Sequence, residues 1–295
     1  MRYLSRLRLV VFAVALMAVA ALIACSNEER PTLVIGGIPD QDLMILDEMF
    51  GGIADYLEDE LGFDVEYRPV TEYATLVTAF RNGDVKLAWF GGLTGVQARL
   101  ATPGAEAIIQ RPRDEEFTSV FIVGSGVQAE SLSDLAGKSF TFGSISSTSG
   151  HLMPRSFLAD AGVDPENDFA GVPSYSGSHD TTWKLVESGS FDAGALSSAV
   201  WERAVAEGQV DESRVRVLMY TEPYWDYHWV AHPEIDEVYG EGTLASTRDA
   251  FKSMSMDDAE QARVLELFLT DSFIDTNNDN YGAIESVART LDLIE

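Results

Sequence analysis

The stretch "SFTFGSISSTSGHLMPRSF", residues 139–157, places a cluster of hydroxyl side chains between a predicted strand and a predicted helix. The strand is expected over 139–142 and the helix from about His151 to Ala161. The first backbone N–H groups of a helix lack internal partners, and the helix dipole makes that end positive. Hydroxyl groups add further donors. We therefore expect a small anion to bind here; the alternative is an ordinary capped helix with spare serines. The cluster consists of Ser144, Ser146, Ser147, Thr148 and Ser149.

The cluster lacks the residues that a nucleotide or a serine nucleophile would need. No lysine lies between Lys138 and Lys184, and the chain has no Gly-x-Gly-x-x-Gly motif, so a triphosphate site is disfavoured. What remains is a cradle of neutral donors for one compact tetrahedral oxyanion. A serine hydrolase with His151 or His179 as base is the competing hypothesis. No Gly-x-Ser-x-Gly elbow or Ser-x-x-Lys pair occurs at the cluster, which makes catalysis the weaker interpretation.

Strands and helices alternate along the chain on both sides of this stretch, which predicts an α/β fold. The first series has strands at 32–35, 65–67, 87–90 and 107–109, with helices at 43–62, 73–80 and 96–101. The second has strands at 117–123, 139–142, 192–196 and 215–220, with helices at 132–135, 151–161, 183–187 and 199–207. Helices are expected at 247–254, 259–269 and 281–291 in the tail.

Two such series without a flexible linker predict two lobes joined by short crossovers near Phe121 and Tyr220. Lobe 1 would contain residues 32–121 and 221–295, and lobe 2 residues 122–220. A ligand is then expected in the cleft between the lobes, at the carboxyl ends of the strands.

The N-terminal residues have the pattern of a secretion signal. Three arginines precede an apolar run, Leu9–Ala24, that is too short to span a bilayer comfortably. The order Leu-Ile-Ala-Cys at 22–25 is similar to a bacterial lipobox, so residues 1–24 are predicted to be a lipoprotein signal peptide. Cys25 would carry the lipid, and 25–31 would form a tether to the outer face of the membrane. A plain signal peptide and an anchor helix are the alternatives.

The charge balance disfavours nucleic acid as a partner. The chain has 48 acidic and 20 basic residues, and nucleic acid binds to basic surfaces. A cation ligand is the obvious alternative, but a solvated acidic surface explains the charge equally well. Exposed charges are screened beyond ~10 Å at ordinary ionic strength, so net charge says little about a closed cleft.

Four stretches together resemble the phosphonate/phosphite-type substrate-binding proteins of ABC importers. The resemblance runs from Ile38-Pro39-Asp40 to about Val230 and is nearest to a subgroup named for selenate. It implies a type II periplasmic-binding-protein fold, with two mixed sheets flanked by helices, that closes about a hinge and delivers its ligand to a permease. A monomer without cofactor or metal is expected. The stretches are "SSTSGHLMPRSFL" (146–158), "YSGSHD" (175–180), "VTEYATLVTAFRNGDVKLAWFGGL" (70–93) and "EFTSVFIV" (116–123).

The resemblance also implies which residues contact the ligand. Ser147, Thr148 and Ser149 match a Ser-Thr-Ser helix start that holds the oxyanion. The other lobe's tyrosine matches Tyr73. A ligand-contacting histidine matches His179. An aspartate near the ligand matches Asp226, although the alignment leaves Tyr227 and His228 as alternatives.

Two positions depart from the family pattern. Phe117 stands where the family has a second tyrosine and cannot donate a hydrogen bond. Ala199 stands where binders of aminophosphonates have a glutamate for the ammonium group, which disfavours a ligand with an amine.

A carboxylate at Asp226 would repel an oxyanion unless a proton lies between them. It would therefore select hydrogen phosphite, hydrogen phosphate or a simple phosphonate. The alternative is a binder of selenate-like or sulfate-like dianions, in which Asp226 would lie outside the pocket. A sensory receptor that signals to a membrane kinase would have the same sequence features. The aromatic run from Tyr220 to Trp229 is expected at the hinge or the pocket rim. Asp275–Asp279 is interpreted as a turn between helices and not as a calcium loop.

Overall fold

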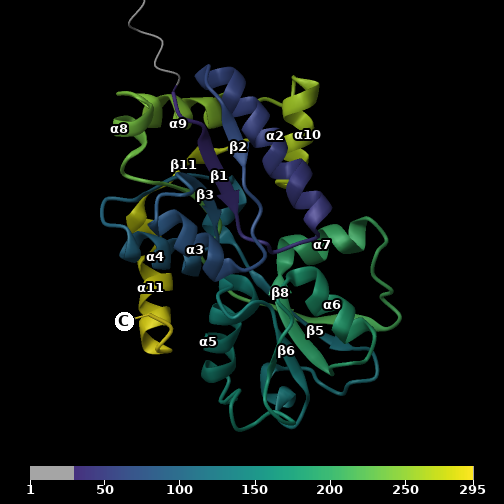
Figure 1. Cartoon of the computed structure of the whole chain (residues 1–295). Helices are drawn as coiled ribbons and strands as arrows, with labels where there is room; N and C mark the ends of the chain where they lie inside the picture. Colours follow the sequence, from purple (N-terminus) through teal and green to yellow (C-terminus); the bar gives the residue numbers. More distant parts are fainter. Residues whose placement is uncertain (1–29, 295) are drawn as a thin grey trace, which may run out of the picture. The chain divides into compact units, whose positions relative to one another are not determined.

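Two mixed β-sheets organise the computed structural model, which describes residues 30–294 (Figure 1). The chain divides into two units, Met1–Pro31 and Thr32–Glu295, and both sheets lie in the second. The predicted signal peptide and Cys25 lie outside the described residues. Within the described part of the chain, no helix has the length and apolar composition needed to cross a membrane.

The first sheet has the strand order β11-β4-β10-β3-β1-β2. β1 pairs in parallel with β2 and β3, whereas β10 lies antiparallel between β3 and β4. The strands are β1 (Leu33–Gly37), β2 (Val65–Tyr67), β3 (Leu87–Phe90), β4 (Glu106–Gln110), β10 (His228–Ala231) and β11 (Ile274–Asp275). The helices are α2 (Leu43–Leu61), α3 (Tyr73–Arg81), α4 (Gly92–Ala101), α8 (Ile235–Tyr239), α9 (Thr243–Ser253), α10 (Ala259–Leu267) and α11 (Gly282–Thr290).

The second sheet has the order β7-β6-β8-β5-β9 and is built from the middle of the sequence. β6 pairs in parallel with β7 and β8, and β5 is antiparallel to both β8 and β9. The predicted two-lobe α/β fold, with a mixed sheet in each lobe, is therefore confirmed. The elements are β5 (Ser119–Gly124), β6 (Phe140–Phe142), β7 (Ser174–Tyr175), β8 (Ala193–Ser197), β9 (Val215–Tyr220), α5 (Met153–Asp160), α6 (His179–Glu187) and α7 (Ser198–Ala206).

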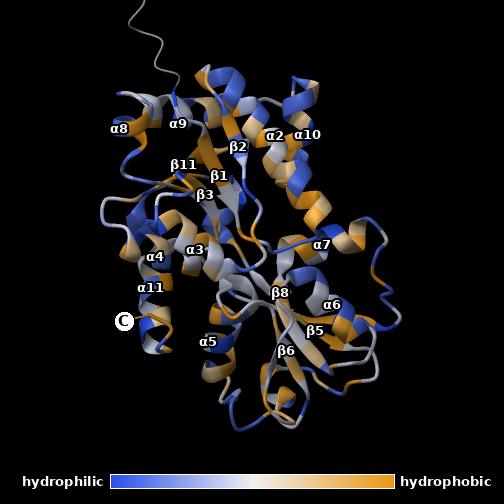
Figure 2. Ribbon diagram, viewed as in Figure 1, coloured by the Kyte–Doolittle hydropathy of each residue, from blue (hydrophilic) through white to orange (hydrophobic). Residues whose placement is uncertain are grey.

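The hydrophobic pattern of α2 explains how the first lobe is covered. Its apolar residues from Leu46 to Leu57 recur at helical spacing, and most of them are buried. The helix ends at Gly62, which adopts a left-handed conformation (φ 71°). Figure 2 shows hydrophobic residues along β1 and β5 and hydrophilic residues on the outer faces of the helices. An aromatic core fills the first lobe, whereas the second lobe has one apolar cluster on each face of its sheet.

Two backbone segments join the lobes. The chain leaves β4 through a 3-10 helix, Pro112–Glu116, and returns from β9 through residues 221–227. The two crossovers pair with each other, because Phe117 and Tyr224 exchange backbone hydrogen bonds of 2.9 and 2.8 Å. β5 begins at Ser119 and β9 ends at Tyr220. The lobe boundaries expected from the sequence, between residues 121 and 122 and between residues 220 and 221, stay a prediction.

Several local features differ from the sequence expectations. The aromatic run ends inside β10, a central strand of the first sheet, where no strand was expected. α4 begins at Gly92 and not at Val96. The expected helix from His151 starts as a π-helical turn, Thr148–Leu152, and continues as α5. Asp275 lies in β11, paired with β4, and not in a turn between helices.

Candidate functional site between the two lobes

The hydroxyl cluster folds onto the end of β6 as a closed turn. Ser147 caps the π-helical turn by accepting a hydrogen bond from the N–H of Gly150 at 2.9 Å. The N–H of Gly143 bonds to the carbonyl of Gly150, and a Cβ at Gly143 would lie 3.2 Å from the Gly150 Cα. Glycine at both positions therefore permits the close approach. Thr148 and Ser149 are buried in this turn.

The start of α4 in the first lobe faces the same turn. Its first N–H groups are bonded by side chains from both lobes, as helix N-termini require. Gly92 N–H donates to Asp226 Oδ1 at 2.8 Å, and Leu93 N–H donates to Thr148 Oγ1 at 2.9 Å. A Cβ at Gly91 would lie 3.0 Å from Thr148 Oγ1 and 3.2 Å from Asp226 Oδ1, so glycine keeps these groups together.

Three predicted site residues each hold a buried polar atom that has no hydrogen-bond partner: Tyr73 Oη, Ser149 Oγ and Asp226 Oδ2. Ser147 and Tyr224 approach Tyr73 and Ser149, respectively, but do not form hydrogen bonds of good geometry with them. Nearly all buried polar groups in proteins are bonded, so three orphaned atoms from α3, the π-helical turn and the second crossover indicate an unmet binding capacity. The others among the described residues belong to Thr102, Gln110 and Trp229.

Burial controls the charge of Asp226. The pKa of its carboxyl group is raised to about 7, chiefly by removal from water. The neighbouring Asp114 adds to the rise, while the Gly92 N–H, Thr148 and Arg111 oppose it. Asp226 therefore exchanges its proton near neutral pH. Asp226 lies fully buried beside Thr148 and the start of α4, and its contact with the ligand stays a prediction.

His179 is buried at the site, but both of its ring nitrogens have protein partners. Nδ1 accepts from the Ser197 N–H at 3.2 Å, and Nε2 lies 3.2 Å from the Tyr227 hydroxyl. Burial lowers the pKa of His179 to about 3, so the imidazole is neutral and Nε2 carries its hydrogen. A neutral imidazole adds no positive charge to the site, and the contact of His179 with the ligand stays a prediction.

The guanidinium of Arg111 is buried beside Tyr227 and is bonded to protein partners. It forms a bidentate pair with Asp114, with bonds of 2.7 and 2.6 Å, and donates to the Phe268 carbonyl at 2.8 Å. Its plane lies over the rings of Trp89 and Tyr227. Arg111 thus contributes a positive background behind the site and leaves neutral donors to face a ligand. Sequence reasoning missed this pair, although an Arg and an Asp three residues apart after a buried strand were visible.

Phe117 has no hydrogen-bonding group, and its contact with the ligand stays a prediction. Its buried ring packs against Tyr224 and Tyr227 with centroid distances of 6.2 and 5.3 Å. The Tyr224 hydroxyl bonds to Ser119 Oγ at 2.6 Å. Asp40 was also missed as a site residue: it accepts from the Tyr227 hydroxyl at 2.9 Å, and burial raises its pKa to about 6.

No histidine is placed to activate a serine of the cluster. His151 Nδ1 donates to the Ile145 carbonyl at 2.7 Å, and Nε2 lies 3.2 Å from the Tyr175 hydroxyl. Burial lowers its pKa to about 4. Since His179 is bonded to Ser197 and Tyr227, neither candidate base contacts Ser147 or Ser149.

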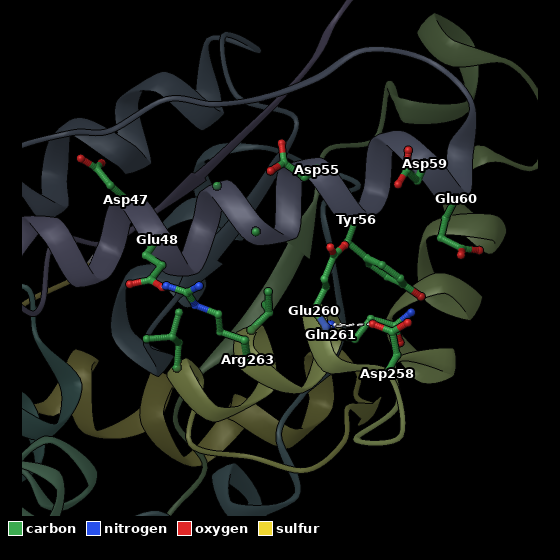
Figure 3. Close-up of a pocket in the computed structure, with 14 residues that line it drawn as sticks. Asp47, Glu48, Asp55, Tyr56, Asp59, Glu60, Asp258, Glu260, Gln261 and Arg263 are labelled. Carbon is green, nitrogen blue, oxygen red and sulfur yellow. Dashed lines mark hydrogen bonds and ion pairs between the residues drawn. The ribbon is translucent and has the colours of Figure 1, made fainter.

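A groove lies away from the candidate site, between α2 and α10. This groove of about 710 Å³ is lined by seven carboxylates, and Figure 3 shows Glu48 of α2 directed toward Arg263 of α10. An excess of carboxylates repels an oxyanion, so the groove is not a second anion site. Within residues 30–294, no group of His, Cys, Asp or Glu side chains is arranged to hold a metal ion.

Comparison with known proteins identifies the family to which this chain belongs. A family model described as the periplasmic substrate-binding protein of a phosphonate ABC transporter matches residues 35–281. The chain belongs to this family. It is a binding protein for transport and not an enzyme, so the serine hydrolase alternative is rejected.

The chain is similar to two known relatives in sequence and to two solved structures in fold. PhnD1 of Prochlorococcus marinus, named as an ABC transporter phosphite-binding protein, is 40% identical over 89% of this chain and 90% of its own. A phosphate-import protein of Mycolicibacterium smegmatis is 26% identical over 66% and 67% of the two chains. The PhnD1 structure in complex with methylphosphonate has a TM-score of 0.87, covering 89% of this chain and 99% of that one. The structure of a phosphonate transporter binding component from Pseudomonas aeruginosa has a TM-score of 0.77 and covers 88% of this chain and 85% of its own. Because its sequence is only 20% identical, it supports the fold alone.

Proposed function

We propose that this protein captures a small phosphorus oxyanion that carries one proton, such as hydrogen phosphite, hydrogen phosphate or methylphosphonate, and delivers it to an ABC permease. The observation that carries the proposal is the set of three orphaned polar atoms on Tyr73, Ser149 and Asp226. Two hydroxyl donors and one carboxylate oxygen match a ligand that offers bare oxygens and a single O–H. The relatives named for phosphite and phosphate support this ligand class.

The hydroxyl groups and a helix N-terminus would hold the oxygens of the ligand. Ser147, Thr148 and Ser149 bring donors from the second lobe, and Tyr73 brings one from the first. Asp226 Oδ2 would share the proton with the ligand, because two unprotonated oxygens in a buried site repel each other. Lobe closure would exclude water and strengthen each of these bonds.

The same site explains which ligands we expect to be rejected. A sulfate-like or selenate-like dianion brings no proton, so it would bind only while Asp226 is itself protonated. An aminoalkylphosphonate would need a carboxylate for its ammonium group, and Ala199 supplies none. The selenate-like alternative is therefore the weaker one, although a pKa near 7 for Asp226 leaves some binding at lower pH.

We propose further that the protein is a monomer anchored outside the cytoplasmic membrane by lipid on Cys25. Residues 1–24 would be removed as a signal peptide, and 25–31 would tether lobe 1 (32–121 and 221–295) and lobe 2 (122–220). The motif at 22–25 and membership of a periplasmic family support this arrangement. Replacing Cys25→Ser should release the protein from the membrane fraction into the soluble extract; continued membrane association would contradict the anchor.

A thermal-shift panel with phosphite, methylphosphonate, phosphate, 2-aminoethylphosphonate, sulfate and selenate at pH 8 tests the ligand class. A ligand at a hundred times its Kd stabilises the protein by about 2.7 kcal/mol. We expect clear shifts with phosphorus oxyanions that lack an amine and weak shifts with sulfate and selenate. A response to selenate alone would overturn the proposal.

A further inference from the structure

Asp226 is held by hydrogen bonds at its backbone N–H, its backbone carbonyl and one of its carboxylate oxygens. The N–H donates to the carbonyl of Asp114 at 3.1 Å. Oδ1 accepts from the Gly92 N–H at 2.8 Å, and the backbone carbonyl oxygen lies 2.9 Å from His228 Nδ1. The remaining polar atom of the residue, Oδ2, has no hydrogen-bond partner. These three bonds therefore set the position of Oδ2, and one of them comes from the His228 imidazole.

The two ring nitrogens of His228 have fixed roles as donor and acceptor. The Arg99 guanidinium can only donate, and its Nη1 lies 2.7 Å from Nε2, so Nε2 accepts. The ring hydrogen is then on Nδ1, which donates to the carbonyl of Asp226. Burial and the neighbouring Arg99 hold the pKa of the fully buried His228 well below its usual value, so the imidazole is neutral. Arg99 thus fixes the hydrogen that His228 donates to Asp226.

One face of α4 supports both the carboxylate and the imidazole. Gly92, Gly95 and Arg99 follow one another at spacings of three and four residues, which places them on the same side of the helix. The imidazole lies against Gly95, where a Cβ would come within 2.4 Å of its Cε1 and Nε2 atoms. The ring also stacks on Tyr281 with a centroid distance of 3.7 Å. Tyr281 directly precedes α11, which lies beside α4 (Figure 1). The ring is therefore held in place where it meets Asp226.

We infer that His228 and Arg99 are positioning residues that fix the carboxyl group of Asp226 at the start of α4. They act through Asp226, because His228 holds its backbone carbonyl and Arg99 holds His228. The same helix supplies the Gly92 N–H that holds Oδ1, so α4 supports Asp226 at its backbone and at its side chain. The contact between Asp226 and a phosphorus oxyanion rests on the proposed function, but the support of Asp226 does not.

The first experiment compares the Kd of phosphite for His228→Gln and His228→Asn. The amide nitrogen of asparagine can take the place of Nδ1 and donate to Asp226, whereas the amide of glutamine takes the place of Nε2. We expect His228→Gln to weaken binding roughly three- to tenfold, the value of one hydrogen bond, and His228→Asn to recover most of that loss. Packing alone predicts the opposite order, because glutamine is closer to histidine in size. Glutamine that binds phosphite as tightly as asparagine would overturn the inference.

A second test removes the group that is positioned. The variant Asp226→Ala has no carboxyl group, so adding His228→Gln to it should weaken phosphite binding by less than about twofold. The two effects are then strongly non-additive, as expected for a residue that acts through Asp226. If His228→Gln costs the same factor in the Asp226→Ala protein as in the wild type, His228 acts by another route and the inference fails.

The third test uses Arg99, which is partly exposed, so its replacement puts folding less at risk. Arg99→Met removes the donor to His228 Nε2 and should weaken phosphite binding roughly two- to fivefold, while Arg99→Lys keeps a donor and should recover part of the loss. The matched control is Arg248→Met, which removes a partly exposed arginine of α9 that bonds Glu106 and should leave Kd unchanged. Equal Kd values for Arg99→Met and Arg248→Met would contradict the role of Arg99.

A fourth measurement needs no ligand and separates a failed positioning role from a failed ligand assignment. Hydrogen exchange of the Gly92 amide, followed by NMR, reports the bond to Asp226 Oδ1, because a bonded N–H exchanges only when the bond opens. His228→Gln should speed this exchange roughly three- to tenfold, and Arg248→Met should leave it unchanged. If phosphite does not bind the wild type but the exchange is faster, the positioning role stands and the ligand class is wrong. Gly92 exchange that His228→Gln leaves unchanged would overturn the inference.

Discussion

Thr148 of the second lobe accepts a hydrogen bond of 2.9 Å from the backbone N–H of Leu93 in the first lobe. The preceding amide, that of Gly92, is bonded to Asp226 from the second crossover. The helix start of α4 is thus completed by the same residues that are expected to contact the ligand. Closure and ligand binding therefore share atoms, so a change at Thr148 should affect both.

Replacing Thr148→Val should weaken phosphite binding roughly tenfold to a hundredfold. Valine has the shape of threonine but no acceptor, so the buried Leu93 N–H would lose its partner in the closed form, at a cost of about 1–3 kcal/mol. Thr148→Ser keeps the oxygen and serves as the control. Isothermal titration calorimetry checks both, and equal affinity of the valine variant and the wild type would contradict the interlobe bond.

Removing the orphaned hydroxyls should reduce affinity without reducing stability. Tyr73→Phe and Ser149→Ala delete oxygens that have no protein partner, so each should leave the melting temperature unchanged or raised while weakening phosphite binding several-fold. Tyr224→Phe is the contrasting variant, because its hydroxyl bonds to Ser119 and its loss should lower stability. A clear fall in stability for Tyr73→Phe would show that its hydroxyl serves the fold.

Asp226 should make the protein less stable as the pH rises from about 4 to about 7. Its folded pKa, raised to about 7, lies above the unfolded value near 4, so the folded state holds an extra proton in this window. The stabilisation is complete below the unfolded pKa and is lost as the pH passes the folded one. Asp40, with a pKa of about 6, contributes in the same direction.

The variant Asp226→Asn isolates this effect, because its amide oxygen can still accept from Gly92. Denaturant unfolding should show it to be more stable than the wild type at pH 8 by about 1–3 kcal/mol, with a smaller difference at pH 5. A difference that does not depend on pH would contradict a buried, titrating carboxyl group.

Substituting Gly91→Ala should weaken phosphite binding while the lobes stay folded. The added Cβ would lie 3.0 Å from Thr148 Oγ1, tighter than ordinary contact, so Thr148 must move away from Leu93. Gly51→Ala in α2 is the control: its Cβ meets no atom within 4 Å, and alanine favours a helix. Calorimetry should show a loss of affinity for the first variant alone; unchanged affinity in both would mean that the contact yields without cost.

The sequence predicted the fold because its signals are local. Helix α2 repeats apolar residues at helical spacing and ends at Gly62, and the hydroxyl cluster follows a short buried strand. β10 was missed because its residues follow a run of aromatic side chains with no alternation. Its strand conformation comes from pairing with β3 and β4, which are more than a hundred residues away in sequence.

Sequence reasoning named residues of the candidate site that hold unpartnered polar atoms, but it did not name the residues that surround them. Tyr73, Ser149 and Asp226 were expected at the ligand, and they hold the orphaned atoms. Asp40 gave no motif, since its partner Tyr227 comes from a distant part of the chain. The Arg111–Asp114 pair is local, but the packing of its guanidinium against Trp89 and Tyr227 arises only on folding. The hydrogen bonds of His179 could not be predicted either, because only folding brings Ser197 and Tyr227 to its two ring nitrogens.

The pH dependence of phosphite and selenate affinity tests the central claim most directly. One proton shared between Asp226 and the ligand predicts that phosphite binding passes through an optimum near neutral pH. Selenate brings no proton, so its affinity should fall about tenfold per pH unit above the pKa of Asp226. Calorimetry between pH 6 and 9 measures both. Tight selenate binding that is constant from pH 7 to 9, with no response to phosphite, would contradict the account.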